Sequence, residues 1–202
     1  MVRILIGAIV GGLIQFIVGA IAWATPLGKL AFKNADLTAT TGIHQAMKDN
    51  LTPTGTGTYF IPSPETAEGT VMMGQGPVGL IHFNSQGFAA PMDPASLLTG
   101  LVLSVVMLFL IGVALSQIDG FTARLRALML IAAATVLYFI VAMPVFNFYM
   151  PWDWWLYLAG ECFVALVAGG YVMLRWFMPA VRATVRESAL PPENRSDVPP
   201  VL

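Results

Sequence analysis

The sequence is poor in charge, in histidine and in cysteine. Only 10% of its 202 residues are charged and 57% are hydrophobic, whereas a water-soluble domain carries about 25% charged residues. The net charge of -1 leaves no basic surface for nucleic acid, so no nucleic-acid partner is expected. The single cysteine, Cys162, excludes an intrachain disulfide and argues against a cysteine-based metal site. These shortages argue against an ordinary soluble domain and against a disulfide-stabilised one.

Sequence motifs of catalysis are missing as well. The chain has no P-loop, no GxSxG, no Rossmann fingerprint and no pair of acids patterned on one element. His44 and His82 are its two histidines, and no spacing such as HExxH supports a metal site. The acids available to complete such a site are Asp36, Asp49, Glu65 and Glu68. We interpret both histidines as surface or core residues of a small polar region, and we expect neither enzyme activity nor a cofactor.

Four long apolar runs are what the sequence does contain. They cover residues 4–24, 95–116, 127–146 and 154–174. At about 1.5 Å of rise per residue, roughly 20 residues cross a hydrocarbon core of about 30 Å. Asp93 and Pro94 make a helix start ahead of the second run, and Pro144 is expected to kink or end the third. The predicted fold class is therefore an all-α integral membrane protein with four transmembrane helices.

The first run has a rival interpretation as a secretory signal peptide. Arg3 precedes the run, and Ala20-Ile21-Ala22 resembles a cleavage site. The apolar core of a signal peptide is about 7–15 residues long, and this run is longer. We therefore interpret residues 4–24 as a retained membrane helix.

Aromatic residues gather between the third and fourth runs, in the stretch PVFNFYMPWDWWLYLAGE of residues 144–161. Trp and Tyr prefer the boundary between membrane and water, where the ring lies among the headgroups and the polar tip stays hydrated. The stretch therefore predicts an interfacial belt where the chain turns from one span into the next. Its members are Trp152, Trp154, Trp155 and Tyr157.

The polar region of residues 25–94 predicts a small α+β extracytoplasmic insertion between the first two spans. Asp36–Leu51 has the apolar spacing of an amphipathic helix, ended by Pro53, Gly55 and Gly57. Thr58–Ile61 and Val78–Phe83 are expected to be strands, joined by a Gly/Pro-rich connection. A core of this size is thin, so we expect the insertion to lean on the membrane helices or on a partner.

Arginines near the span ends predict the orientation. On a four-span path they all fall on one side; they are Arg3, Arg124, Arg126, Arg175, Arg182 and Arg186. Three lysines lie in the long insertion, where charge counts little toward orientation. Both termini are therefore expected in the cytoplasm, with the insertion and the belt outside. Residues 179–202 are expected to form a cytoplasmic tail that frays into disorder.

Polar residues inside the spans predict a buried layer. Gln15 shares a helix face with small residues, as does Glu161, and small residues let membrane helices approach closely. We predict that the first and fourth spans pack tightly and that Gln15 and Glu161 are hydrogen-bonded across the contact. Ser104 and Tyr138 fall at a similar depth and complete the predicted layer. The predicted packing face consists of Gly11, Gly12, Gly19, Ala165 and Ala168.

Glu161 has two interpretations. An acid within a membrane is costly and often marks a proton or ion site. Alternatively, a single carboxyl group serves a structural role through one hydrogen bond, or reaches the headgroup layer. A proton pathway needs several ionisable groups and no other span contains one, so we favour the structural role.

The chain resembles a set of small bacterial four-span inner-membrane proteins to which no activity is attached. The resemblance lies in RILIGAIVGGLIQFIVGAIAW, in GTYFIPSP with GPVGLIHFNSQG, and in FYMPWDWW. It implies the topology and a place in the inner membrane of a bacterium, and it assigns no functional residue. The function predicted first is that of a non-catalytic accessory or assembly subunit, whose partners are the lipid bilayer and other membrane subunits or a second copy. The alternatives are a small transporter that uses Glu161, and an envelope ligand or stress sensor with a pocket between the insertion and the belt.

Overall fold

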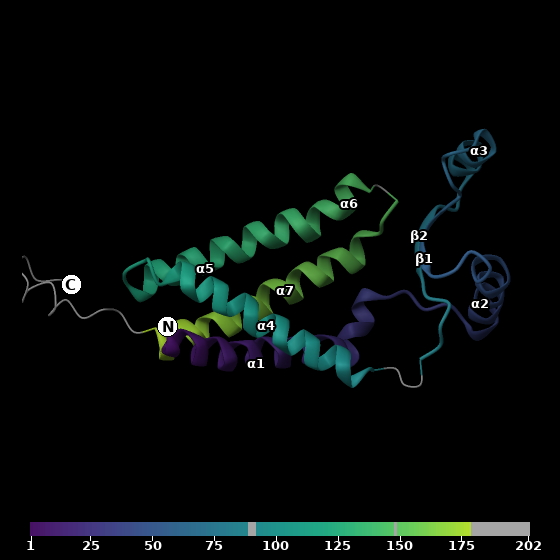
Figure 1. The fold of residues 1–202 in the computed structure, drawn as a ribbon. Coiled ribbons are helices and arrows are strands. Elements are labelled where there is room, and N and C mark those ends of the chain that lie inside the picture. The colour runs from purple at the N-terminus through teal and green to yellow at the C-terminus, as the bar shows by residue number, and fades with distance from the viewer. Residues whose placement is uncertain (89–91, 148, 179–202) are drawn as a thin grey trace, which may run out of the picture. The chain divides into compact units, whose positions relative to one another are not determined.

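A computed structural model describes residues 1–88, 92–147 and 149–178 of the chain, and these residues are mostly helical (Figure 1). The predicted tail of residues 179–202 lies outside the described residues. The chain forms two compact units. Of the described residues, the first contains 1–17, 100–132 and 165–178, and the second contains 18–88, 92–99, 133–147 and 149–164.

The four long apolar helices predicted from the sequence are present, and each is long and apolar enough to cross a membrane. They are α1 (Val2–Ala24), α4 (Pro94–Leu115), α5 (Phe121–Val136) with α6 (Ala142–Phe146), and α7 (Trp152–Val172). A π-helical turn, Leu137–Val141, joins α5 to α6, and a second one, Met173–Phe177, extends α7. The described helices therefore match the predicted runs, with longer ends in the third and fourth.

The turn between α4 and α5 is shorter than predicted. The polar pattern predicts a turn over Ser116–Ala123, but α5 already begins at Phe121. Gly120 has a φ of +85°, a left-handed value that glycine adopts without strain and that ends the turn. Arg124 and Arg126 consequently belong to the first turns of α5.

Both predicted helix-end signals are confirmed. Asp93 caps α4, since its Oδ2 accepts hydrogen bonds from the Ser96 backbone N–H at 2.9 Å and from the Ser96 hydroxyl at 2.7 Å. Pro144 lies in α6, which ends two residues later at Phe146. A proline donates no backbone hydrogen bond, and the wider π-helical turn comes immediately before the helix that contains it.

Large aliphatic side chains fill the centre of the first unit. The fully buried ones come from α4, α5 and the end of α7, and they are Leu108, Leu115, Leu128, Met173 and Leu174. Glycines bring α1 and α4 into close contact, because a Cβ on Gly12 would lie 2.9 Å from the backbone nitrogen of Val105. The unit therefore combines large side chains at its centre with a glycine at the contact between α1 and α4.

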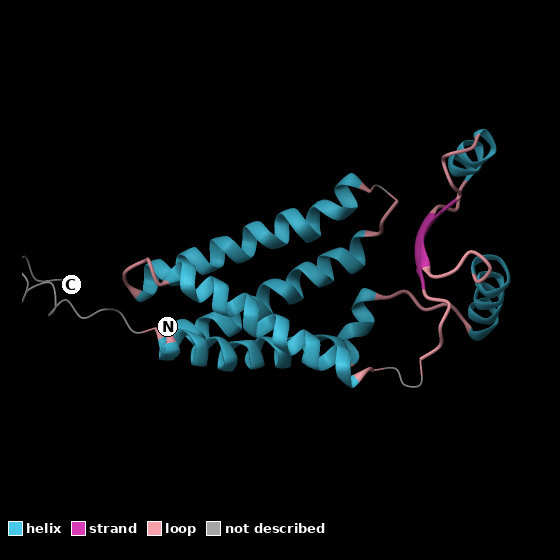
Figure 2. Ribbon diagram, viewed as in Figure 1, coloured by secondary structure: helices cyan, strands magenta, loops and turns pink. Residues whose placement is uncertain are grey.

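The second unit contains the insertion, in which two helices accompany a two-stranded sheet (Figure 2). A 3₁₀ helix (Pro26–Ala31) leads to α2 (Leu37–Leu51), β1 (Gly57–Ile61), α3 (Ala67–Gln75) and β2 (Gly79–Phe83). The strands pair antiparallel, with Thr58 opposite His82. The predicted helix and both predicted strands are thus confirmed to within one residue at each end, and Asp36 caps α2 through a 2.7 Å bond from Ala39 N–H.

The helix α3 is a correction, because the Gly/Pro-rich pattern predicts an irregular connection there. Thr66 caps α3 by accepting a 3.0 Å hydrogen bond from the Gly69 backbone N–H. A Cβ on Gly69 would collide with the carbonyl oxygen of Ser63. Glycine disfavours a helix by about 1 kcal/mol on intrinsic propensity, yet here it is the residue that lets the helix start pack against the preceding chain.

Candidate functional site

Helices α1 and α7 contact each other along what we call the α1–α7 seam. In the first unit, a Cβ on Gly11 would lie 2.5 Å from the carbonyl oxygen of Gly169, so the two backbones touch. One helical turn away, a Cβ on Gly7 would lie 3.0 Å from Met173 Cγ. Small residues allow this approach, as expected for helices that associate within a membrane.

The seam continues in the second unit. A Cβ on Gly19 would lie 3.1 Å from Glu161 Oε1, and the Tyr157 hydroxyl donates a 2.6 Å hydrogen bond to the carbonyl oxygen of Ala22. That carbonyl belongs to the last turn of α1, where backbone oxygens lack partners within the helix. The prediction that the first and last long helices pack tightly is therefore confirmed.

The two predicted polar centres are satisfied to different degrees. The Oε1 atom of Gln15 is buried, and no described residue donates a hydrogen bond to it. Glu161 is partly buried, and its Oε2 accepts a hydrogen bond from the Cys162 thiol at 3.3 Å. Gln15 belongs to the first unit and Glu161 to the second, so the hydrogen bond predicted between them stays a prediction.

The other members of the predicted layer have local partners or lie at the surface. Ser104 donates a 3.0 Å hydrogen bond to the Gly100 carbonyl oxygen of its own helix. Tyr138 is 69% exposed and its ring lies edge-on to Phe139. The structure therefore does not bring Tyr138 into the interior.

The predicted packing face is largely at helix contacts. Ala165 is buried, whereas Ala168 is partly exposed, and Gly169 makes the closest backbone contact of α7 instead. The sequence holds a signal for this residue, because Gly169 lies eight positions after Glu161 and four after Ala165. That spacing keeps all three on one helix face.

The aromatic belt contains one residue that the prediction omits. Trp23, at the end of α1, has its ring centroid 5.1 Å from that of Tyr157 and 6.2 Å from that of Trp154. Trp154 also contacts Trp155, with centroids 4.9 Å apart, and Trp152 is 45% exposed. Such tilted and edge-on pairs add about 0.5–1.5 kcal/mol each beyond area burial, so they stabilise the seam where α1 ends and α7 begins.

Two further contacts within the second unit join the insertion to residues at the start of α7 and just before it. Phe60 of β1 packs edge-on against Tyr149, which precedes α7, with ring centroids 4.7 Å apart. Lys33 and Asp153 form an ion pair at 3.0 Å, but the Lys33 side chain is 91% exposed. An exposed pair of this kind contributes about 0–1 kcal/mol, so the aromatic contact is the stronger of the two.

Arg124 is buried, with 4% of its surface exposed, and its guanidinium donates to two carbonyl oxygens. Nε bonds to Ile118 at 2.6 Å and Nη1 bonds to Met178 at 2.7 Å. Met178 follows the π-helical end of α7, where unpaired carbonyls favour a cation. Arg124 therefore closes the end of α7, a role that its position in the sequence does not reveal.

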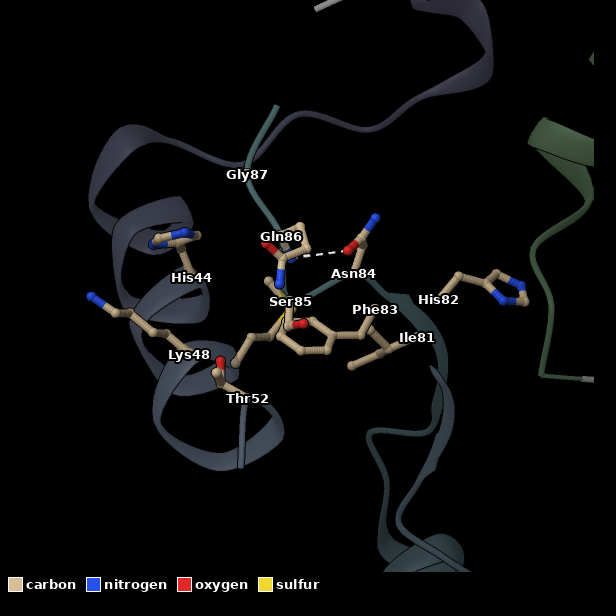
Figure 3. A pocket seen from close by; sticks show the side chains of 11 residues that line it. His44, Lys48, Thr52, Ile81, His82, Phe83, Asn84, Ser85, Gln86 and Gly87 are labelled. Atoms are coloured by element: carbon tan, nitrogen blue, oxygen red, sulfur yellow. Dashed lines mark hydrogen bonds between the residues drawn. The ribbon is translucent and has the colours of Figure 1, made fainter. Parts of the chain in front are cut away.

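A cavity of about 480 Å³ lies in the insertion between α2 and the segment that follows β2 (Figure 3). We call it the insertion cavity. His44 and Lys48 line it from α2, and Asn84–Gly87 line the opposite side. The rest of the lining consists of the apolar residues Met47, Ile81 and Phe83 together with Thr52 and His82. The predicted sensor pocket, by contrast, would lie between the insertion and the belt.

The two histidines point in different directions. His82 extends from β2 away from α2, and its Nδ1 lies 3.0 Å from the Thr58 hydroxyl, whereas His44 belongs to the α2 side of the cavity (Figure 3). Among the described residues, no group of three or more His, Cys, Asp or Glu side chains is placed to hold a metal ion. Comparison of the chain with protein-family models, with curated proteins and with solved structures finds no match.

Proposed function

We propose that this protein is a multi-pass protein of the bacterial inner membrane and serves as a non-catalytic accessory or assembly subunit of a larger membrane complex. In this proposal both termini lie in the cytoplasm and the insertion lies outside. The four apolar helices support membrane insertion, and the arginines at their ends support the orientation.

The observation that carries the accessory role is the apolar exposure of the insertion. Among its described residues, the buried hydrophobic side chains are Ala31 and Leu51. Exposed large apolar side chains are far more numerous, and the most exposed are Leu37 at 82%, Phe88 at 73%, Leu30 at 69% and Val71 at 60%. Burying one such side chain contributes about 1.5–3 kcal/mol of favourable free energy. A partner that covers several of them therefore gains substantial binding free energy.

The partner that fits best is the extramembrane part of another membrane-bound subunit. The insertion is joined to the helix ends through Phe60 and Lys33, which keeps it beside the apolar helices. Anchoring two proteins in one membrane raises their effective concentration, so a modest apolar contact is sufficient for a lasting complex. A soluble partner lacks this advantage.

Site-specific photocrosslinking in intact cells tests the proposal. A benzoylphenylalanine at Val71 or at Phe88 is expected to crosslink to the same membrane protein, which co-purifies in mild detergent at a fixed stoichiometry. Val71→Glu places a charge in the contact and is expected to reduce co-purification about tenfold. Glu68→Gln, on the same helix α3, is the matched control and should leave the partner bound.

Two results would contradict the accessory role. Crosslinks from both positions only to a second copy of this chain would replace it by self-association. Equal recovery of the partner with Val71→Glu and Glu68→Gln would show that the exposed apolar face of α3 does not contribute to the contact.

A further inference from the structure

We propose that the insertion cavity binds a small organic anion with an apolar part. The proposal concerns a ligand rather than a partner subunit, so it stands independently of the accessory role. It rests on the size of the cavity, on a polar wall that is held in place before a ligand arrives, and on the kinds of groups that line it.

The size is suitable for a metabolite. Small-molecule sites commonly enclose about 300–1,000 Å³ and combine an apolar lining with a few polar groups. The insertion cavity has a volume of about 480 Å³. Ile81 and Phe83 alternate along β2 with His82, so both face the cavity while His82 points away from α2 (Figure 3).

The polar wall is fixed by its own hydrogen bonds. Asn84 Oδ1 accepts a 2.9 Å hydrogen bond from the Gln86 backbone N–H, which is drawn in Figure 3. The hydroxyl of Thr56 accepts a 3.1 Å hydrogen bond from the Ser85 backbone N–H and lies 3.0 Å from the Ser85 hydroxyl. The wall therefore needs little ordering when a ligand binds, which lowers the entropic cost of association.

Hydrogen-bond donors remain free around this space. Figure 3 shows Gln86 between His44 and Asn84, and the Gln86 side-chain amide has no partner among the described residues. The stem of Lys48 lines the cavity one helical turn after His44, and its ammonium has no ion-pair partner in the described part of the chain. In Figure 3 the ammonium is turned away from Gln86, but the flexible four-carbon stem allows it to turn toward a ligand.

Acidic groups do not compete for these donors. The lining contains no aspartate or glutamate. Asp49 follows Lys48 in α2 but is not part of the lining, and both of its carboxylate oxygens accept a hydrogen bond from the Gln45 side-chain amide at 2.9 Å. A site with free donors, a lysine and no carboxylate favours a ligand that accepts hydrogen bonds and carries negative charge.

Calorimetric titration of the full chain in detergent tests the proposal. The probe is 1-naphthyl phosphate, compared with uncharged 1-naphthol and with inorganic phosphate, and empty micelles provide the baseline. We expect saturable binding of 1-naphthyl phosphate with a Kd below about 1 mM, and weaker binding of both comparison probes. Lys48→Gln should weaken binding about tenfold, while Lys29→Gln, which lies outside the lining, should leave it unchanged.

A cavity-filling variant supplies a second, independent test. Gly87 lines the cavity, and a Cβ added there meets no atom within 4 Å, so Gly87→Trp can bring a large side chain to the lining without a backbone clash. Gly74→Trp on α3 is the matched control, since a Cβ there also meets no atom within 4 Å and the residue is not part of the lining. Binding should be lost in Gly87→Trp and retained in Gly74→Trp, with unchanged helical circular dichroism in both.

The proposal is overturned if 1-naphthyl phosphate does not saturate the unmodified protein, or if folded Gly87→Trp binds it equally well. Equal affinity for 1-naphthol would overturn the anionic character of the ligand. An equal Kd for Lys48→Gln and Lys29→Gln would likewise overturn the anionic character of the ligand, because Lys48 would then contribute nothing to binding.

Discussion

Replacing Gly169 by alanine places a methyl group in the α1–α7 seam, against the backbone of Gly11. Neither Gly169 nor Gly11 has room for an added Cβ atom. A Cβ on Gly169 would collide with the carbonyl oxygen of Gly11. The reciprocal Cβ on Gly11 would lie 2.5 Å from the Gly169 carbonyl oxygen, where ordinary contact begins at 3.4 Å, which is a shortfall of about 0.9 Å. Gly169→Ala therefore forces the helices apart by at least this much, and the neighbouring contacts loosen with them.

The magnitude follows from two opposing effects. Overpacking of a close contact costs about 1–3 kcal/mol, while a glycine-to-alanine change in a helix gains about 1 kcal/mol from intrinsic propensity. Gly160 provides a matched control on the same helix, because a Cβ there meets no atom within 4 Å. Since both variants share the propensity gain, Gly169→Ala should be less stable than Gly160→Ala by about 1–3 kcal/mol.

The assay is equilibrium unfolding in mixed micelles, read by circular dichroism. Gly11→Ala and Gly169→Ala are expected to lower the free energy of unfolding by less together than the sum of their separate effects, because either one alone already separates the helices. If Gly169→Ala is as stable as Gly160→Ala, the two backbones do not touch and the seam described here is wrong.

Three further predictions concern single side chains. Arg124→Met removes two hydrogen bonds from a guanidinium to helix-end carbonyls and should lower the free energy of unfolding by about 2 kcal/mol, whereas Arg126→Met, at an exposed position, should change it little. Tyr157→Phe should cost about 1 kcal/mol in the same assay, while Tyr138→Phe, at an exposed ring, should be neutral. The hydrogen bonds to Asp93 from the Ser96 hydroxyl and from backbone N–H groups lower the pKa of this carboxyl. The stability that the Asp93 cap adds is therefore fully present at a pH above the ordinary aspartate pKa. It is lost as the pH falls through the lowered pKa of Asp93 in the folded protein. Amide hydrogens in the first turn of α4 should lose protection against exchange as the pH falls through this range. In Asp93→Asn their protection should no longer change with pH in this way.

Composition and periodicity predicted the long helices because an apolar run of sufficient length has few alternatives to a helix. Asp93 and Pro144 located helix ends through local backbone chemistry, which does not depend on the rest of the fold. The close packing of α1 on α7 was also predictable, because the small residues around Gln15 and Glu161 form one face on each helix. These features are encoded within single segments of the chain.

The features that escaped prediction depend on contacts between segments. Gly69 weakens the helical signal of α3 and is explained only by its contact with Ser63. The burial of Arg124 depends on the carbonyl of Met178, far along the chain. The insertion cavity requires α2 to lie beside the segment after β2, and no spacing within either segment indicates this.

The proposed function has one premise, which is that the insertion lies outside the cytoplasm while the turn between α4 and α5 lies in it. Cysteine labelling tests it directly in a Cys162→Ala background, which removes the single native thiol. We expect Thr54→Cys to react with a membrane-impermeant maleimide in cells whose outer membrane has been permeabilised. Gln117→Cys should react only after the inner membrane is disrupted. Labelling of Gln117→Cys before disruption, with protection of Thr54→Cys, would contradict the orientation, and equal labelling of both would contradict membrane insertion itself.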